Sequence, residues 1–381
     1  MFRELALLVA AGIVGPLLAR WRNGLVPVVV GELAMGAVVG NTGFRLINPR
    51  VSAFPVLYGL GFAMLMLTAG THFDVRSTAI RRGAPRGLLA LAAVLAVSVP
   101  VGLAIGTLLG VGHQPLFIVL LAGSSAAVAF PIIEERKLRG PAIAYISAWI
   151  ALADGITVVL MPLTLTGSGK AIPALVSDAV VIAAGVVVAV VSRRLQTRPV
   201  VRSTVDASVS RGWALQLRVS MLFLLVLAAV AQGMGGSILV AGFTAGMVII
   251  YLGEPDRLQL QVSGLANGFF VPIFFVLLGA ELDLRALVSD PRAMVLAVVL
   301  AAGAVVVHLA AALLTGAEQR VASGLAASAQ LGLPAAAAGL AIVTHALSPA
   351  YAAALVAAGC LSLVPATLGA ARLSGVDLPD G

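Results

Sequence analysis

Residues 141–165 read PAIAYISAWIALADGITVVLMPLTL, an apolar run that carries a single carboxylate, Asp154, near its middle. The run is long enough to cross a bilayer, which takes about 20 apolar residues in a helix. A charged Asp at the centre of a membrane helix costs roughly 2.5–3.5 kcal/mol on insertion scales, and ionisable groups at that depth mark ion or proton pathways. Asp154 is therefore the first candidate for an ion-binding residue.

The composition of the whole chain indicates a polytopic helical membrane protein. Its 381 residues are 60% apolar and 10% charged, and the mean hydropathy is +1.08. Over such long apolar runs helices satisfy their own backbone polar groups in lipid. The net charge of +8 comes from Arg residues in short loops between apolar segments. Membrane topology explains these residues better than nucleic-acid binding, so the expected surroundings are a lipid bilayer and no nucleic acid is expected as a partner.

The single cysteine, Cys360, excludes an intrachain disulfide and a Cys-based metal cluster. No cofactor is expected. The chain shows no clustered Asp, Cys or His residues with ligand or nucleophile spacing, so an enzyme is not expected either. The first apolar run lacks a small-x-small cleavage site and is followed at once by further runs, which favours a first helix over a signal peptide.

The fold class predicted from the hydropathy pattern is an all-α protein with thirteen transmembrane helices. The apolar segments fall at about 4–20, 25–41, 54–71, 86–111, 115–133, 141–165, 172–192, 213–232, 236–252, 263–281, 292–314, 319–345 and 349–371. Counting Lys and Arg in the connecting loops gives 18 on one side and 6 on the other. Because cytoplasmic loops carry the excess of positive charge, we expect the N-terminus outside, the C-terminus inside and a location in the cell inner (plasma) membrane.

The two halves of the chain resemble each other. The third segment ends with the motif G-x-x-x-D-x-R at residues 70–76, and the tenth ends with the same motif at residues 279–285. Gly36 and Gly246 correspond in the second and ninth segments. The third and tenth segments leave the membrane on opposite sides, which indicates an inverted repeat typical of secondary transporters. We expect one transmembrane domain over residues 1–371, divided into repeat one (about 1–165), a linking helix with a basic loop (166–212) and repeat two (213–371), followed by a cytoplasmic tail at 372–381.

Two segments in matching positions of the halves are interrupted by small residues and proline. The fifth contains LAGSSAAVAFP at residues 121–131, and the twelfth contains SAQLGLP at residues 328–334. Ser124, Ser125 and Gln330 could satisfy backbone groups released by an unwound turn, or offer oxygen to a cation. The alternative is an ordinary proline kink surrounded by packing residues. We expect two discontinuous helices.

Further motifs cover almost the whole membrane region. Residues 26–40, VPVVVGELAMGAVVG, contain the pattern P-x-x-x-G-E-x-x-x-G-x-x-x-G, and residues 272–283 read PIFFVLLGAELD. With the paired serines of the fifth segment, these motifs resemble the monovalent cation:proton antiporter-2 family. The resemblance implies a sodium/proton antiporter-like fold with a scaffold domain and a core domain in which the two discontinuous helices cross. It also implies elevator-like alternating access, a homodimer, and exchange of a monovalent cation, Na⁺ or K⁺, for protons.

The sequence departs from the pattern of this family at three positions. Ala153 stands where relatives commonly have a second polar residue beside Asp154, and Leu333 stands where many have Glu. The eleventh segment has neither Lys nor Arg, and its only ionisable group is His308. A histidine there could titrate near neutral pH and replace the missing cation, or be a satisfied core residue.

A single exchanging carboxylate has a simple consequence for stoichiometry. Burial favours the protonated form of a carboxylate and a bound cation favours the charged form, so proton and cation exclude each other on Asp154. We therefore expect electroneutral exchange of one proton for one cation, without a cofactor.

Two other functions remain open from the sequence. The same fold could carry a small organic anion, although no intramembrane Arg or Lys is available to meet one. The lost polar positions would also fit a transport-inactive membrane sensor or assembly subunit.

Other ionisable residues are expected to have supporting roles. Glu32, in a short apolar span, is expected to be structural or to line the entrance funnel. The charged residues 134–137 are expected to form an interfacial loop. Four residues at the membrane ends are expected to cap or anchor helices: His72, Asp74, Asp283 and Arg285.

Overall fold

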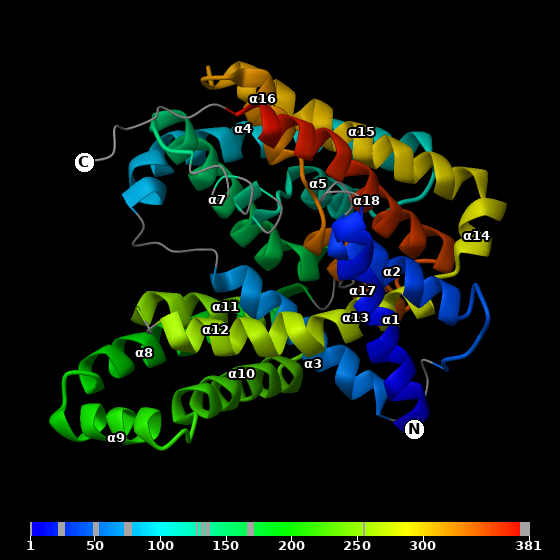
Figure 1. Cartoon of the computed structure of the whole chain (residues 1–381). Coiled ribbons are helices and arrows are strands. Elements are labelled where there is room, and N and C mark those ends of the chain that lie inside the picture. Colours follow the sequence, from blue (N-terminus) through cyan, green and yellow to red (C-terminus); the bar gives the residue numbers. More distant parts are fainter. Residues whose placement is uncertain are drawn as a thin grey trace. The chain divides into compact units, whose positions relative to one another are not determined.

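Helices make up all the regular structure of the described residues in the computed structural model (Figure 1). The structure describes residues 2–21, 27–48, 53–71, 78–126, 129–130, 133, 138–165, 171–253 and 256–373.

Ten helical runs in this part of the chain are long and apolar enough to cross a membrane. Eight are single helices: α1 (Phe2–Trp21), α3 (Phe54–Thr71), α4 (Thr78–Leu108), α7 (Pro141–Leu165), α8 (Ala171–Leu195), α10 (Leu215–Gly233), α15 (Pro291–Leu314) and α18 (Pro349–Arg372). Two are composite: α12 (Asp256–Leu265) with the π-helix η1 (Ala266–Phe270) and α13 (Val271–Glu281), and α16 (Arg320–Ala327) with α17 (Gly332–Thr344). The chain is thus a multi-pass membrane protein.

Shorter helices complete the described chain. The apolar helices α2 (Val28–Val39) and α11 (Ile238–Leu252) are shorter than a full span, and α5 (Gln114–Ala122) precedes a break; α9 (Pro199–Ser210) and α14 (Leu284–Ser289) lie between longer helices. The segments of the predicted pattern correspond to these elements, while the exact count of thirteen spans stays a prediction.

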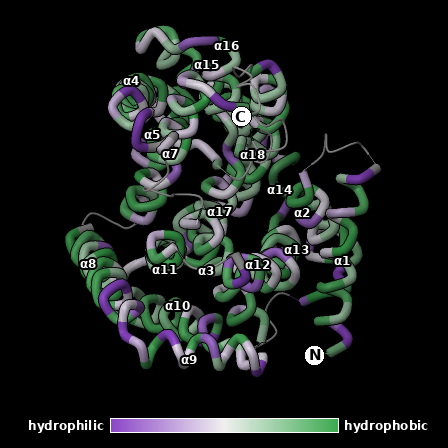
Figure 2. The backbone as a smooth tube through the Cα atoms, turned by 60° about the vertical axis from the view of Figure 1, so that its left-hand side comes forward, coloured by the Kyte–Doolittle hydropathy of each residue, from purple (hydrophilic) through white to green (hydrophobic). Residues whose placement is uncertain are grey.

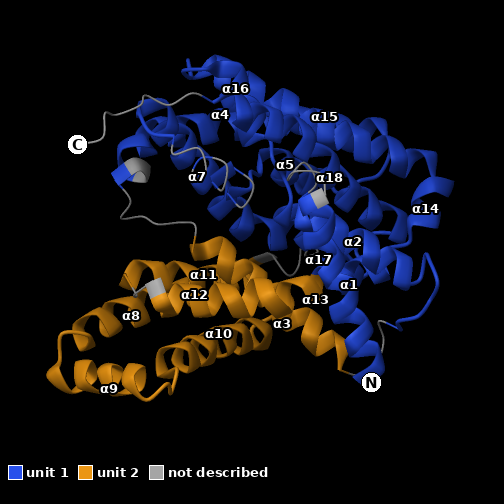
Figure 3. Ribbon diagram, in the orientation of Figure 1, with its two compact units in different colours: residues 1–51, 75–165, 275–381 blue, residues 52–74, 166–274 orange. Residues whose placement is uncertain are grey.

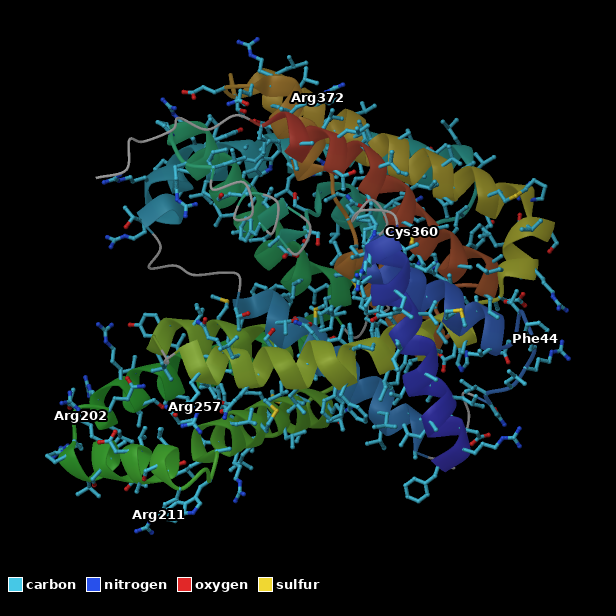
Figure 4. The ribbon with its side chains drawn as sticks, in the orientation of Figure 1. Phe44, Arg202, Arg211, Arg257, Cys360 and Arg372 are labelled. Carbon is cyan, nitrogen blue, oxygen red and sulfur yellow. The ribbon has the colours of Figure 1, made fainter. Side chains whose placement is uncertain are left out.

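Helical structure extends beyond the predicted apolar segments at several points, of which α4 and α9 are two examples. Helix α4 begins at Thr78, eight residues before the predicted start of its segment, and includes exposed Arg residues. Helix α9 lies in the stretch predicted as a basic loop, where Figure 2 shows hydrophilic residues and Figure 4 marks Arg202 and Arg211 at its two ends. Hydropathy marks the part of a helix that lies in lipid, whereas polar residues can continue the helix beyond it.

The described helices form two compact units, coloured separately in Figure 3. Unit 1 comprises residues 1–51, 75–165 and 275–381, and unit 2 comprises residues 52–74 and 166–274. Each unit contains helices from both predicted repeats, because helices pack against partners that are distant in the sequence. The division into consecutive repeats therefore differs from the division by packing.

The glycines that correspond in the two sequence repeats also lie at equivalent helix crossings. In unit 1, α2 crosses α13 where a Cβ on Gly36 would lie 2.2 Å from the Val276 carbonyl oxygen, and one on Gly279 would lie 3.1 Å from Gly36 Cα. In unit 2, α3 crosses α11 where a Cβ on Gly70 would lie 3.1 Å from Gly246 Cα. Such contacts leave room only for glycine. Because the repeat matches Gly36 with Gly246 and Gly70 with Gly279, the two crossings are the same contact made twice, which supports the predicted repeat.

Candidate functional site

The first predicted interruption is present in unit 1 at the end of α5. The helix ends at Ala122, residues 123–125 are non-helical, and helical structure resumes at Ala126. Ser124 is 1% and Ser125 6% exposed, so both hydroxyl groups are inside the protein. Pro131 lies outside the described residues.

The second predicted interruption is present in the same unit between α16 and α17. Helix α16 ends at Ala327 and α17 begins at Gly332. Pro334 lies in the first turn of α17, where the missing backbone N–H of proline costs no helical hydrogen bond. Gln330 lies in the break and is 5% exposed. Both segments are therefore interrupted helices rather than continuous kinked ones.

Each break supplies a side chain that caps the half-helix of the other. The Ser124 hydroxyl donates to the carbonyl oxygen of Ala327, the last residue of α16, at 2.7 Å. The Gln330 amide Nε2 donates to the carbonyl oxygens of Leu120 and, at 3.2 Å, Gly123 at the end of α5. The last carbonyls of a helix have no partner within it, so these bonds satisfy buried acceptors.

A serine of α18 fixes the backbone of the second break. The hydroxyl of Ser362 accepts a hydrogen bond from the Gln330 backbone N–H at 3.0 Å and donates to the Gly359 carbonyl oxygen at 2.7 Å. Gln330 is thus held by its backbone to α18 while its side chain reaches α5. Gln330 therefore connects the second break both to α18 and to the end of α5.

Asp154 faces the first break from the middle of α7. The backbone N–H of Ala126, where the helix resumes, points at the Asp154 carboxylate oxygen Oδ2 at 3.4 Å. The side chain is half-buried. A helix start offers unpaired N–H groups and a partial positive charge, so this position suits a carboxylate that must at times be charged.

Thr157 lies beside Asp154 and is not among the residues predicted from the sequence. It is fully buried, and its hydroxyl donates to the Ala153 carbonyl oxygen at 2.7 Å. A Cβ on Gly123 would lie 3.6 Å from its Oγ1, which brings Thr157 next to the break. It lies three positions after Asp154 in the chain, a spacing that puts both residues on one helix face and could have been read from the sequence.

His308 of α15 is joined to the same break. Its Nδ1 bonds the Ala304 carbonyl oxygen at 2.8 Å, and its Nε2 lies 3.3 Å from the Ser124 hydroxyl. A carbonyl only accepts, so Nδ1 carries a proton and Nε2 is the nitrogen that can change its protonation. The ring is 0% exposed and stacks on Trp149 at 5.7 Å between centroids.

The chemistry available here suits a small hard cation. Asp154 offers a carboxylate, and Ser124, Ser125 and Thr157 offer hydroxyl oxygens, all ligand types that alkali cations accept. Leu333 adds none, although a Cβ on Gly123 would lie 2.7 Å from its Cδ2. Among the described residues of unit 1, Ser124 is hydrogen-bonded to His308, and Gln330 bonds the carbonyl oxygens of Leu120 and Gly123 at the same break. Asp154 is joined to this break through Ala126.

The remaining predicted residues lie elsewhere. Asp283 caps α14, because its Oδ1 accepts from the Ala286 N–H at 2.9 Å, which confirms its expected capping role. Arg285 is exposed, and Glu32 in α2 is 2% exposed. His72, Asp74 and residues 134–137 lie outside the described residues.

Sequence comparison shows the family to which the chain belongs. Residues 6–372 match the model of a family described as sodium/hydrogen exchanger, transmembrane. A putative Na⁺/H⁺ antiporter of Bacillus subtilis, YjbQ, is 27% identical over 71% of this chain and 46% of its own length. The Na⁺/H⁺ antiporter NhaS5 of Synechocystis is 26% identical over 68% of this chain and 37% of its own length. The chain thus matches less than half the length of these two relatives.

Structural comparison shows the same fold. The sodium proton antiporter MjNhaP1 of Methanocaldococcus jannaschii at pH 8 superposes with a TM-score of 0.65 at 17% identity, covering 97% of this chain and 96% of that one. A second structure of MjNhaP1, from electron microscopy, gives a TM-score of 0.67 at 16% identity and covers both chains completely. The predicted antiporter-like fold is therefore confirmed.

Proposed function

Because the chain belongs to the sodium/hydrogen exchanger family, we propose that it is a secondary antiporter that exchanges a monovalent cation for protons across the membrane. Relatives named as Na⁺/H⁺ antiporters support Na⁺ as the first cation to test. K⁺ is the second, since the oxygen ligands near Asp154 do not by themselves select between them.

Asp154 is the residue that carries the exchange in this proposal. The observation behind it is the backbone N–H of Ala126 at 3.4 Å from Oδ2, at the point where the helix resumes. With its proton the carboxyl group is neutral, and without it the group attracts a cation that the nearby hydroxyl oxygens can help to coordinate. One carboxylate cannot hold both, so proton and cation alternate on it.

This single site sets the stoichiometry. The loaded site carries either one proton or one cation, so the charge moved inward equals the charge moved outward in each cycle. Among the described residues hydrogen-bonded into the two breaks, His308 is the only other titratable group. We assign it to a packing role, stacked on Trp149 beside Ser124, rather than to carrying a second proton. Alternating access and a homodimer complete the proposal.

Ser124 and Gln330 have positioning roles here. The hydroxyl proton of Ser124 goes to Ala327, so its oxygen can bind a cation, or can accept from His308 Nε2 when that nitrogen carries a proton. The amide nitrogen of Gln330 is engaged by the end of α5, so only its Oε1 remains for a cation. Ser125 adds a further buried hydroxyl.

The test is proton movement in proteoliposomes that carry an internal pH dye and an imposed pH gradient. We expect Na⁺ to collapse the gradient, and Li⁺ and K⁺ are added to rank the cations. A response to a small organic anion and to none of the three cations would identify an anion transporter. No response to either class would favour a sensor or assembly subunit. Both results would contradict the proposal.

A further inference from the structure

A second buried carboxylate lies in unit 2, in a helix that takes no part in the site described above. Asp178 is in the second turn of α8, and its side chain is 3% exposed. Both carboxylate oxygens are buried, and neither has a hydrogen-bond partner in the described part of the chain. A carboxyl group in this situation requires an explanation, because leaving a buried acceptor unpaired costs free energy and leaving a buried charge unpaired costs far more.

The surroundings of Asp178 are apolar. On α8 the residues one turn before and after it, Ala174 and Val181, are 1% and 0% exposed. The neighbouring Ser177 packs on the turn between α10 and α11, since a Cβ on Gly236 would lie 2.0 Å from Ser177 Oγ. The outer face of α8 is apolar as well, with Leu175 49% exposed. Asp178 therefore lies between a lipid-facing stripe and a tightly packed turn.

The polar groups nearest in the chain already have partners. The hydroxyl of Ser177 donates to the Ala231 carbonyl oxygen at 3.4 Å. The hydroxyl of Ser237 caps α11 by accepting from the Leu239 N–H at 3.2 Å. Neither bond involves the carboxyl group of Asp178.

The other charged and titratable side chains of α8, α10 and α11 lie at the ends of these helices that are distant from Asp178. Helix α8 packs on α11 and α10. Along the described residues of these three helices the other titratable groups are Arg193, Arg194, Arg218 and Tyr251. Ser177, next to Asp178, packs on Ala231 and Gly236. Each of the four groups lies thirteen residues or more along its helix from Asp178, Ala231 or Gly236, which is about 20 Å at 1.5 Å per residue. No positive charge on these helices faces Asp178 to compensate a carboxylate.

We propose that Asp178 is a second proton-binding site of the chain. Its carboxyl group holds a proton while α8 is packed on the α10–α11 turn, and loss of that proton loosens the packing. The group is separate from Asp154 and binds a proton but no sodium ion, because the hydroxyl groups beside it are engaged and supply no set of oxygen ligands. The proposal does not depend on the transport function assigned to Asp154.

Infrared spectroscopy of the purified protein in lipid tests this directly. The spectrum of wild type minus Asp178→Asn should contain the carbonyl band of a protonated carboxyl group at neutral pH. The matched control is Asp206→Asn, since Asp206 is exposed on α9 of the same unit. Its difference spectrum should lack that carbonyl band. Should Asn at position 178 prevent folding, Asp178→Leu provides the same subtraction.

The outcomes are distinct. A carboxylate signature for Asp178 at neutral pH would overturn the proposal, and so would loss of the protonated band on adding Na⁺ at constant pH, which would identify a cation site. Thermal unfolding gives a second readout. Between about pH 4 and pH 7 the melting temperature of wild type should fall relative to that of Asp178→Asn, because the unfolded chain releases the Asp178 proton at about pH 4 while the folded protein keeps it. Parallel curves would also overturn the proposal.

Discussion

The side chain of Gln330 offers the sharpest perturbation of the two breaks. Replacement by Leu keeps a similar volume and removes both donors to α5. Gly123 then loses its bond at 3.2 Å, while the Leu120 oxygen still accepts from the Gly123 N–H at 3.1 Å. The Gly123 carbonyl oxygen is left unsatisfied, which lowers the free energy of unfolding by about 1–3 kcal/mol. The lost bond to the Leu120 oxygen lowers it by about 1 kcal/mol more. The sum is roughly 2–4 kcal/mol.

Two assays detect this loss in Gln330→Leu. The melting temperature of the purified protein should fall, and the Na⁺-dependent rate should fall as the capped arrangement becomes less populated, since every 1.4 kcal/mol lowers the ratio of capped to uncapped protein about tenfold. The control is Gln232→Leu, whose side chain is exposed in unit 2. A Gln330→Leu protein with the stability and rate of wild type would refute the idea that the two breaks hold each other.

Three further predictions follow from the same contacts. Ser124→Ala should lower the melting temperature and the transport rate, since the Ala327 carbonyl and His308 Nε2 both lose their partner, and unchanged values would argue against the second cap. Gly36→Ala and Gly70→Ala should each destabilise the protein by about 1–3 kcal/mol or more, because each Cβ would meet a carbonyl oxygen at 2.2 Å. The control is Gly264→Ala, where a Cβ would have no atom within 4 Å and no such clash should occur. A potential-sensitive dye should report no voltage during exchange; a voltage would require a second titrating group, and its loss in His308→Gln would identify that group.

The elements that carry function were largely predictable from the sequence. Hydropathy gives the spans because lipid requires long apolar runs, and the small residues before Pro131 and Pro334 mark the two breaks. The motif around Gly70 and Gly279 predicts an internal repeat, and the paired glycine crossings agree with it.

Other features depend on packing that no local pattern specifies. Which carbonyl Ser124 or Gln330 caps is decided by where α16 and α5 end relative to each other. Helix α9 is missed because its polar residues resemble a loop. Asp178 carries the same signal as Asp154, one acid in an apolar run, but it falls in the linking helix, where the repeat offers no counterpart.

The central claim is that proton and cation share Asp154, and one measurement tests it most directly. Detergent-solubilised protein, lightly buffered at neutral pH, is given a pulse of NaCl while a pH indicator records released protons, for wild type, Asp154→Asn and the exposed-site control Asp206→Asn. We predict proton release from wild type and from Asp206→Asn, and none from Asp154→Asn. The amide of Asn carries no titratable proton that sodium could displace. Normal sodium-induced proton release from Asp154→Asn would contradict the account.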